Sequence, residues 1–239
     1  MLELSELVKR FPVGDAEPVS AVDGVSLSIA AGELVALYGP SGSGKSTLLM
    51  MAAAVLRPDS GSVLVAGRDV SRLSAGEAAR YRMHELGFIR QSLDLIPGAS
   101  ALDNAAVKLL GKPASVREAR RKVEPLLRRL GLSERLGHRA EQLSMGERQR
   151  VMIARALSTE PKVVLADEPT GSLDSERGAE VLSMLRDLCH ARGIAVLLVT
   201  HDPEAAAYAD RVETLRDGRL LPPREAADSS VRSASSERR

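Results

Sequence analysis

At residues 39–46 the chain carries Gly39-Pro40-Ser41-Gly42-Ser43-Gly44-Lys45-Ser46, which matches the pattern G-x-x-x-x-G-K-[ST]. The apolar run from Leu34 to Tyr38 precedes it and predicts a strand, while the residues from Lys45 to Val55 predict a helix. A strand, a glycine-rich loop and a helix in this order are the context that supports a phosphate-binding loop. Glycine residues let backbone N–H groups converge on phosphate oxygens, and the helix N-terminus adds its positive end.

The last residues of this loop have separate expected tasks. Lys45 is expected to reach the β- and γ-phosphates of a nucleotide and to assist catalysis, and Ser46 is expected to bind Mg²⁺. The candidate nucleotide-binding residues of the loop are Gly39, Pro40, Ser41, Gly42, Ser43, Gly44, Lys45, Ser46 and Thr47. The alternative is a glycine-rich turn without function, which the strand and helix on either side disfavour.

A second motif ends a buried strand with two carboxylates. The apolar run from Val163 to Ala166 is followed by Asp167 and Glu168. Such a run is expected in a parallel sheet covered on both faces, and it places the carboxylates at the sheet edge where α/β proteins bind ligands. Asp167 is predicted to hold Mg²⁺, and Glu168 to polarise the water that attacks the γ-phosphate. A plain strand cap is the alternative, and the phosphate-binding loop favours function.

Composition indicates a globular protein without a nucleic-acid-binding charge field. The 239 residues suffice for one large domain, or for two subdomains with a shared core, and the net charge is +1. The single cysteine, Cys189, lies in an apolar helix-like run and is predicted to be structural. The four histidines are scattered and lack metal-ligand spacing. We therefore expect no nucleic-acid partner.

The chain has no apolar run that approaches the roughly 20 residues needed to span a bilayer. In residues 1–9, acidic residues are interspersed among apolar ones, and the segment lacks the continuous apolar stretch of a signal peptide. We therefore expect a cytoplasmic chain without a direct membrane span, so any role at a membrane requires a partner.

The remaining pattern alternates short apolar runs with helical periodicity. Strands are predicted at 2–8, 24–29, 62–66, 87–90 and 194–200, helices at 101–110, 116–130, 144–157 and 175–191, and a hairpin at 211–220. Ser144 and Glu147 fit a capping box at the start of one helix, and Asp217-Gly218 fits the hairpin turn. Residues 221–239 are predicted to be a disordered tail.

The sequence from Leu143 to Arg150, Leu-Ser-Met-Gly-Glu-Arg-Gln-Arg, resembles the signature of the ATP-binding-cassette (ABC) ATPases, and the resemblance covers about residues 1–220. Gln91 is placed where the family has its Q-loop glutamine, and His201 where it has its switch histidine. Gly171-Ser172-Leu173-Asp174 resembles the D-loop. Phe11 falls where the family stacks an aromatic ring on adenine, although an ordinary strand residue remains the alternative.

This resemblance implies an α/β fold. The expected domain is a single ABC ATPase domain at 1–220, a P-loop NTPase core with an antiparallel β subdomain and a helical subdomain inserted at about 92–145. The implied activity is hydrolysis of ATP to ADP and phosphate, with Mg²⁺ held by Ser46, Gln91 and Asp167 and catalysis by Glu168, His201, Gln91 and Lys45. In the ATP state a head-to-tail homodimer is implied, in which Ser144 and Gly146 of one subunit meet the ATP bound by the other.

The segment from Phe88 to Pro97, with Leu102-Asp103-Asn104 and Glu147 to Arg150, resembles cassettes of the lipoprotein-release, macrolide-export and cell-division type. Such cassettes pair with integral-membrane permeases, which implies a place at the cytoplasmic face of a bacterial membrane. One residue departs from the signature, because Met145 stands where the family has Gly. A bulky side chain there is expected to slow dimer closure or lower turnover.

Two functional classes remain after this comparison. The first is an ATPase that drives a permease, and the presence of both Glu168 and His201 favours it. The second is a regulatory ATP-binding switch with little sustained hydrolysis, and Met145 is the only residue that favours it. A kinase is disfavoured because no acceptor-site pattern accompanies the loop. The length also excludes a two-cassette translation factor, and residues 47–142 cannot supply the coiled coil of a chromosome-structure ATPase.

Overall fold

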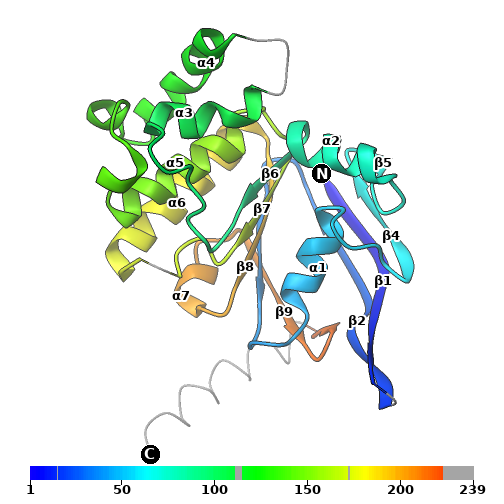
Figure 1. Cartoon of the computed structure of the whole chain (residues 1–239). Helices are drawn as coiled ribbons and strands as arrows, with labels where there is room; N and C mark the ends of the chain where they lie inside the picture. The colour runs from blue at the N-terminus through cyan, green and yellow to red at the C-terminus, as the bar shows by residue number, and fades with distance from the viewer. Residues whose placement is uncertain (15, 111–114, 172, 223–239) are drawn as a thin grey trace, which may run out of the picture.

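The computed structural model describes residues 1–14, 16–110, 115–171 and 173–222. A six-stranded sheet forms its centre, in the order β10-β9-β3-β8-β7-β6 (Figure 1). Its strands are β3 (Leu34–Tyr38), β6 (Leu86–Ile89), β7 (Val163–Asp167), β8 (Ala195–Thr200), β9 (Arg211–Arg216) and β10 (Arg219–Leu220). All pairs are parallel except β9 with β10, so the carboxyl ends of β3, β6, β7 and β8 meet at one edge.

A second sheet is antiparallel and has the order β2-β1-β4-β5. Its strands are β1 (Leu2–Val13), β2 (Ala16–Ile29), β4 (Ser60–Val65) and β5 (Arg68–Asp69). The helix α1 (Lys45–Ala52) lies between the two sheets, and one apolar cluster includes residues of both sheets and of α1. This shared core fixes the start of α1 relative to the central strands.

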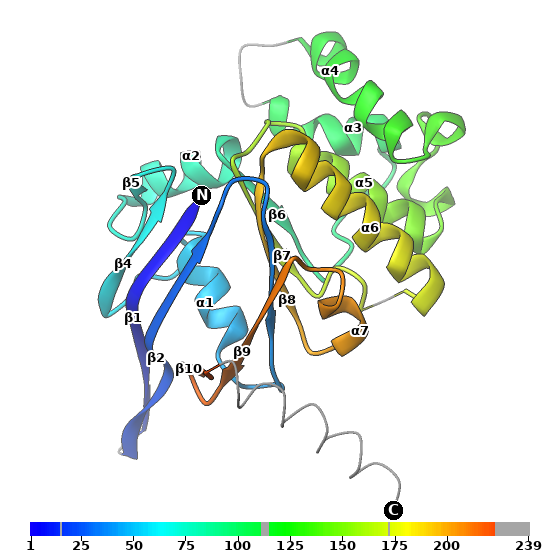
Figure 2. The ribbon, with the colours of Figure 1, turned by 180° about the vertical axis from the view of Figure 1, so that it is seen from behind.

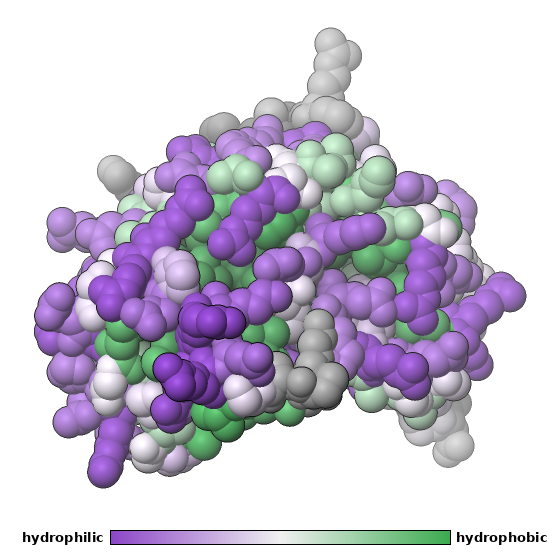
Figure 3. All heavy atoms as spheres, turned by 90° about the horizontal axis from the view of Figure 1, so that it is seen from above, coloured by the Kyte–Doolittle hydropathy of each residue, from purple (hydrophilic) through white to green (hydrophobic). Residues whose placement is uncertain are grey.

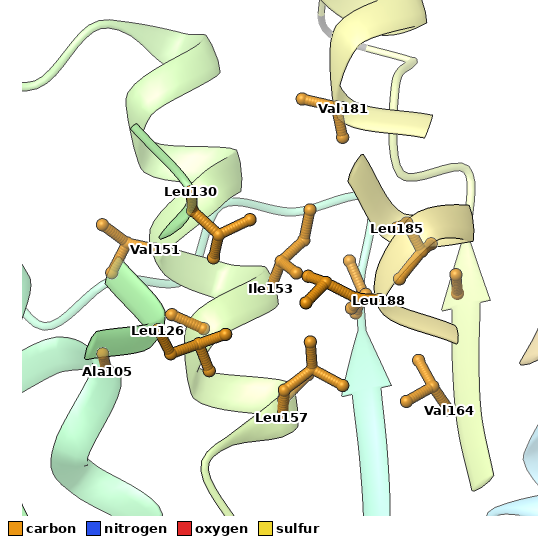
Figure 4. Packing of buried hydrophobic residues seen from close by; sticks show 14 of the residues in the cluster. Ala105, Leu126, Leu130, Val151, Ile153, Leu157, Val164, Val181, Leu185 and Leu188 are labelled. Carbon is orange, nitrogen blue, oxygen red and sulfur yellow. The ribbon is translucent and has the colours of Figure 1, made fainter. Parts of the chain in front are cut away.

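The described residues form six further helices: α2 (Ala75–His84), α3 (Ala101–Ala106), α4 (Val116–Arg129), α5 (Met145–Leu157), α6 (Ser175–Arg192) and α7 (Pro203–Ala206). Short 3-10 turns lie at Val107–Leu109, Ser133–Arg135 and Ala140–Gln142. Helices α5 and α6 cover the sheet face opposite α1 (Figure 2), while α3 and α4 pack on the far side of α5. In Figure 4, Ile153 and Leu157 of α5 lie among leucines of α4 and α6.

Several elements differ from the sequence predictions. β1 and β2 are longer than predicted, and α2, β5 and α7 were not predicted at all. Helix α1 ends three residues early, because Ala54 adopts a left-handed backbone with a φ of 49° that a helix cannot continue. The hairpin with its turn at Asp217-Gly218 is confirmed, and both turn residues have the positive φ of a type I′ turn. Nearly all of the predicted tail, 223–239, lies outside the described residues.

The predicted absence of membrane-spanning segments can be examined for the described part of the chain. There, no helix combines the length and apolar character that crossing a bilayer requires. Figure 3 shows the molecule from above, and hydrophilic side chains cover most of this face.

Cys189 is buried in α6, and its thiol donates to the carbonyl of Ile194 at 2.7 Å. Burial raises the pKa of Cys189 to about 12, which agrees with a structural role.

Candidate active site

A cavity of about 340 Å³ opens at the carboxyl edge of the central sheet. It is lined by Ala21, Ser41, Gly42, Gly44, Lys45, Ser46, Thr47, Gln91, Asp167, Glu168, Val199 and His201. Apart from Ala21 of β2, these residues lie at or just after the carboxyl ends of four different parallel strands. The predicted phosphate-binding loop, acidic strand end, Gln91 and His201 therefore line one cavity.

The loop between β3 and α1 leaves a helix N-terminus open to this cavity. Gly44 is the N-cap of α1, and no side chain caps the helix or adds an acid to its first turn. The free N–H groups of such a terminus favour an anion. Gly44 has a φ of 102°, and a Cβ there would collide with the carbonyl of Ala21. Only glycine fits this position, so the loop is built as a cradle that suits a phosphate group.

Lys45 places a cation at this cradle. Its side chain is buried, and its Nζ donates to the carbonyls of Gly39 and Pro40 at 2.7 and 2.8 Å. Burial lowers the pKa of Lys45, and the charges of Glu168 and Asp167 oppose this change. An ammonium has three donors, so one remains for a ligand beyond the two carbonyls. Gly39 and Pro40 thus position Lys45 and do not line the cavity themselves.

Asp167 and Glu168 bring two adjacent carboxylates to the same edge. Burial raises the pKa of Asp167, and the charge of Glu168 raises it further. The Glu168 backbone has a φ of 45°, which is uncommon for a residue with a Cβ, and its N–H donates to the Val199 carbonyl at 3.0 Å. Strained backbone of this kind occurs mainly at functional sites.

The Glu168 carboxylate is held by the residues that end β8. The Thr200 hydroxyl donates to Oε2 at 3.0 Å, and the His201 backbone N–H donates to Oε1 at 2.9 Å. The His201 ring nitrogen Nδ1 lies 2.6 Å from the same Oε1. The carboxylate is therefore fixed beside the cavity, while the His201 side chain remains 63% exposed. Sequence analysis missed Thr200, whose only signal is its place between an apolar strand and His201.

Gln91 follows β6 and reaches toward the loop after β7. A Cβ on Gly171 would lie 3.4 Å from Gln91 Nε2, so the amide group approaches that loop closely. Gly171 is the first residue of the stretch that resembles a D-loop. The second, Ser172, lies outside the described residues. Leu173 and Asp174 are described, and Asp174 caps α6.

Besides Gly39 and Pro40, four predicted nucleotide-binding residues do not line this cavity within one chain. Ser144 and Gly146 are at the start of α5, where Ser144 and Glu147 form the predicted capping box. Phe11 is 38% exposed on β1, with Lys9 Nζ 5.8 Å from the centre of its ring. Ser43 is a buried residue of the loop, and its hydroxyl has no hydrogen-bond partner among the described residues.

Comparison with known proteins places the chain among relatives of one kind. The sequence model of the family described as ABC transporter matches residues 22–171. The macrolide export ATP-binding/permease protein MacB of Burkholderia thailandensis is 47% identical over 221 residues, which make up 92% of this chain and 34% of that protein. The pyoverdine export ATP-binding/permease protein PvdT of Pseudomonas aeruginosa is 47% identical over 223 residues, 92% of this chain and 33% of that protein. The chain thus spans about a third of the length of these curated relatives.

Solved structures share the fold. A post-hydrolysis state of the ATP-binding cassette MJ0796, a dimer bound to ADP and Pi, matches with a TM-score of 0.83 and 35% identity, over 93% of this chain and 97% of that one. The structure of cbiO1 from Clostridium perfringens, part of the ABC transporter complex cbiONQ, matches with a TM-score of 0.83 and 28% identity, over 99% of this chain and 94% of that one. These matches confirm the predicted α/β cassette fold, and the chain belongs to the ABC transporter family as an ATP-binding cassette.

Proposed function

We propose that this cassette hydrolyses MgATP in the described cavity and that ATP-dependent closure of a homodimer drives an integral-membrane permease. The observation that carries the proposal is the Glu168 carboxylate, which Thr200 and His201 hold at the edge of a cavity that Lys45 also lines. A fixed carboxylate beside a phosphate cradle suits hydrolysis better than binding alone. Residues 1–220 would form the cassette, with the segment at about 92–145 as its inserted helical subdomain.

The triphosphate would be bound by the backbone N–H groups of the loop and by Lys45. Ser46, Gln91 and Asp167 offer a hydroxyl, an amide oxygen and a carboxylate, which are the hard oxygen ligands that Mg²⁺ prefers. When bound, the metal ion would neutralise charge on the phosphate oxygens. Phe11 would stack on the adenine ring.

Glu168 would act as general base toward the attacking water. Its carboxylate accepts hydrogen bonds on both oxygens, so its orientation is set before substrate arrives. His201 would sense the γ-phosphate: its ring contacts Glu168, and its side chain is largely exposed.

The second subunit would complete the site. Ser144 is exposed at the N-cap of α5 and does not line the cavity of its own chain, so it is available to another copy, whereas Gly146 is buried in the single chain. The α5 N-terminus would add a second positive helix end at the γ-phosphate, and hydrolysis would weaken that contact and let the dimer open. The relative MJ0796 is a dimer in its solved structure, which supports this arrangement.

The permease partner follows from the relatives. MacB and PvdT are ATP-binding/permease proteins for macrolide and pyoverdine export, and this chain matches about a third of each. We infer a permease of this type for the present cassette, at the cytoplasmic face of a bacterial membrane. The second candidate, a regulatory ATP switch, is favoured by one observation: Met145 is 46% exposed at the start of α5, where it would face the dimer seam.

Phosphate release from MgATP by the purified chain tests hydrolysis directly. Wild type should turn over continuously, whereas Glu168→Gln should bind ATP without releasing phosphate. Glu180→Gln is the control, because this exposed α6 acid pairs only with Arg150 in the described structure. ATP binding without turnover by wild type would favour the regulatory switch.

The partner is tested with the same Glu168→Gln variant. Pulled from detergent-solubilised host membranes with MgATP, it should bring with it a protein with several membrane spans and permease character, identified by mass spectrometry. Recovery of the cassette without any such protein, while it binds ATP, would contradict the permease assignment.

A further inference from the structure

A buried asparagine holds the segment that follows Gln91. Asn104 of α3 is fully buried. Its Nδ2 donates to the carbonyls of Ile96, Ala99 and Ser100, each at 3.2 Å, and its Oδ1 accepts from the Ile96 backbone N–H at 2.7 Å. Buried polar groups are costly unless paired, so this amide fixes the path of the backbone from 96 to 100.

Arg155 of α5, a second helix, donates hydrogen bonds to the same part of the chain. Its Nη1 donates to the carbonyl of Asp94 at 2.8 Å, its Nε to the carbonyl of Asn104 at 2.9 Å, and its Nη2 to the Asn104 side-chain oxygen at 2.7 Å. A guanidinium has a rigid planar fork of donors, so three bonds from one group fix α5 relative to both partners. Each of these acceptors is neutral, so Arg155 sets geometry here and forms no ion pair within the described part of the chain.

Gln91 lies in the short segment 90–94, between the central sheet and the point where Arg155 binds the backbone of Asp94. On one side, Ile89 is paired with Ala166 in the parallel ladder of β6 and β7. On the other side, Asp94 is held to α5 by Arg155. Within this segment, one carboxylate oxygen of Asp94 accepts from Arg90 Nη1 at 3.1 Å and from the Ser92 hydroxyl at 2.8 Å. These contacts make residues 90–94 a compact loop, so a shift of α5 relative to the sheet must be absorbed within it.

The same helix carries the expected contact with the second ATP at its other end. Ser144 caps α5, and Arg155 lies eleven residues later, which corresponds to about 16 Å along a helix axis. Between them, Val151 and Ile153 pack in the core with residues of α4 and α6 (Figure 4). Packed cores resist continuous deformation, so α5 moves as one body from its N-terminus to Arg155.

We propose that Arg155 is a positioning residue for Gln91: when the α5 N-terminus meets or leaves a nucleotide, Arg155 carries that displacement to residues 90–94 and sets how far Gln91 enters the cavity. The inference rests on the proposed function, because it assumes that Gln91 and the α5 N-terminus both serve ATP hydrolysis. It assigns to Arg155 and Asn104 a role that the cavity lining alone does not give them.

A double-mutant cycle in MgATP hydrolysis tests the connection. Arg155→Lys keeps the charge but loses the fork, and we expect kcat to fall about tenfold with KM for ATP within about twofold, since small misplacements of a catalytic group cost this much. In a Gln91→Ala background the same substitution should change kcat by less than about twofold, because the residue through which it acts is gone. Independent, multiplicative losses would overturn the proposal.

Arg82→Lys is the matched control. Arg82 is also half-buried and donates to a backbone carbonyl, that of Ala54 at 2.7 Å, outside the segment after Gln91. Its substitution should leave kcat within about twofold. An equal loss of kcat in Arg82→Lys would assign the effect to general destabilisation and reject the proposal.

A second variant covers the case in which Arg155→Lys does not fold. Asn104→Asp retains the oxygen that accepts from Arg155 and Ile96 but loses the three donations to carbonyls, and it should repeat the dependence on Gln91. Loss of kcat by Asn104→Asp that persists without Gln91 would refute the connection. The proposed function fails separately, if wild type releases no phosphate from MgATP.

Discussion

The Nδ1 atom of His201 lies 2.6 Å from the Oε1 atom of Glu168. When Glu168 is ionised, this contact requires a proton on Nδ1, which leaves Nε2 of the ring toward solvent. The parallel pairing of β7 with β8 produces the contact. Asp167 lies opposite Val199, so Glu168 just after β7 and His201 just after β8 come to lie side by side. The sheet register thus joins the expected base to the expected phosphate sensor.

Removal of this ring should lower turnover without preventing binding. For His201→Ala we expect kcat to fall by about 10²-fold or more, the usual range for a group that assists proton transfer or charge stabilisation. ATP affinity should change little, since Lys45 and the loop remain. Steady-state phosphate release measures kcat, and His190→Ala is the control because His190 pairs only with Asp210 in the described structure. A full-rate His201→Ala would contradict the assigned role.

Substitution of Lys45 should instead weaken nucleotide binding. A hydrogen bond from a charged donor contributes about 1.5–3 kcal/mol, so Lys45→Ala should reduce ATP affinity by about ten- to a hundredfold. Titration with a fluorescent ATP analogue gives the affinity. Lys162→Ala, an exposed lysine just before β7, should bind as wild type does. Unchanged affinity in Lys45→Ala would place the phosphates elsewhere.

Met145→Gly should raise turnover if the methionine obstructs dimer closure. The side chain is 46% exposed at the first position of α5, so its removal leaves no buried cavity. We expect a gain in kcat of a few-fold, together with some loss of helix stability, because glycine within a helix costs about 1 kcal/mol. Met83→Gly, at an exposed site on α2, controls for the stability effect. An unchanged ATPase rate would remove the hypothesis.

Lys108 should make stability depend on pH in the alkaline range. Burial lowers its pKa to about 8, with Arg155 adding a further decrease, while Nζ donates to the Leu86 carbonyl at 2.6 Å. Above this pKa the unfolded chain, with an ordinary lysine near 10.5, binds the extra proton. The contribution of Lys108 to the free energy of unfolding therefore rises with pH between about 8 and 10.5, by at most about 1.4 kcal/mol per pH unit.

Urea unfolding at pH 7.5, 8.5 and 9.5 checks this slope. Lys108→Met should remove it, so the difference in unfolding free energy between wild type and variant should grow with pH. Lys122→Met is the control, because Lys122 is an exposed partner of Glu160. A constant difference across the three pH values would show that Lys108 titrates normally.

The predictable part of the site consists of residues close together in sequence. The loop from Gly39 to Ser46 has its strand before it and its helix after it, so local pattern was sufficient to assign it. Asp167 and Glu168 were marked by the apolar strand in front of them. The hydrogen bond from Thr200 to Glu168 arises only from strand register, and the hydrogen bond from Arg155 to the Asp94 carbonyl arises only from helix packing. Neither contact is therefore marked by a local sequence pattern.

The missed elements have weak patterns for identifiable reasons. Helix α2 buries only Ala78 and Tyr81, so its apolar face is narrow, although Ser74 and Glu77 form a capping box that could have marked its start. β1 contains register shifts, and Glu6 has a positive φ, which interrupts the alternation that defines a strand. The length of β1 was therefore underestimated from sequence.

The most direct test of the central claim is the mass of Glu168→Gln in solution, measured by light scattering on a sizing column with and without MgATP. Two chains that enclose ATP between Lys45 of one and Ser144 of the other should give twice the chain mass with MgATP and a single chain mass without nucleotide. A variant that binds MgATP and remains a single chain would contradict the shared site.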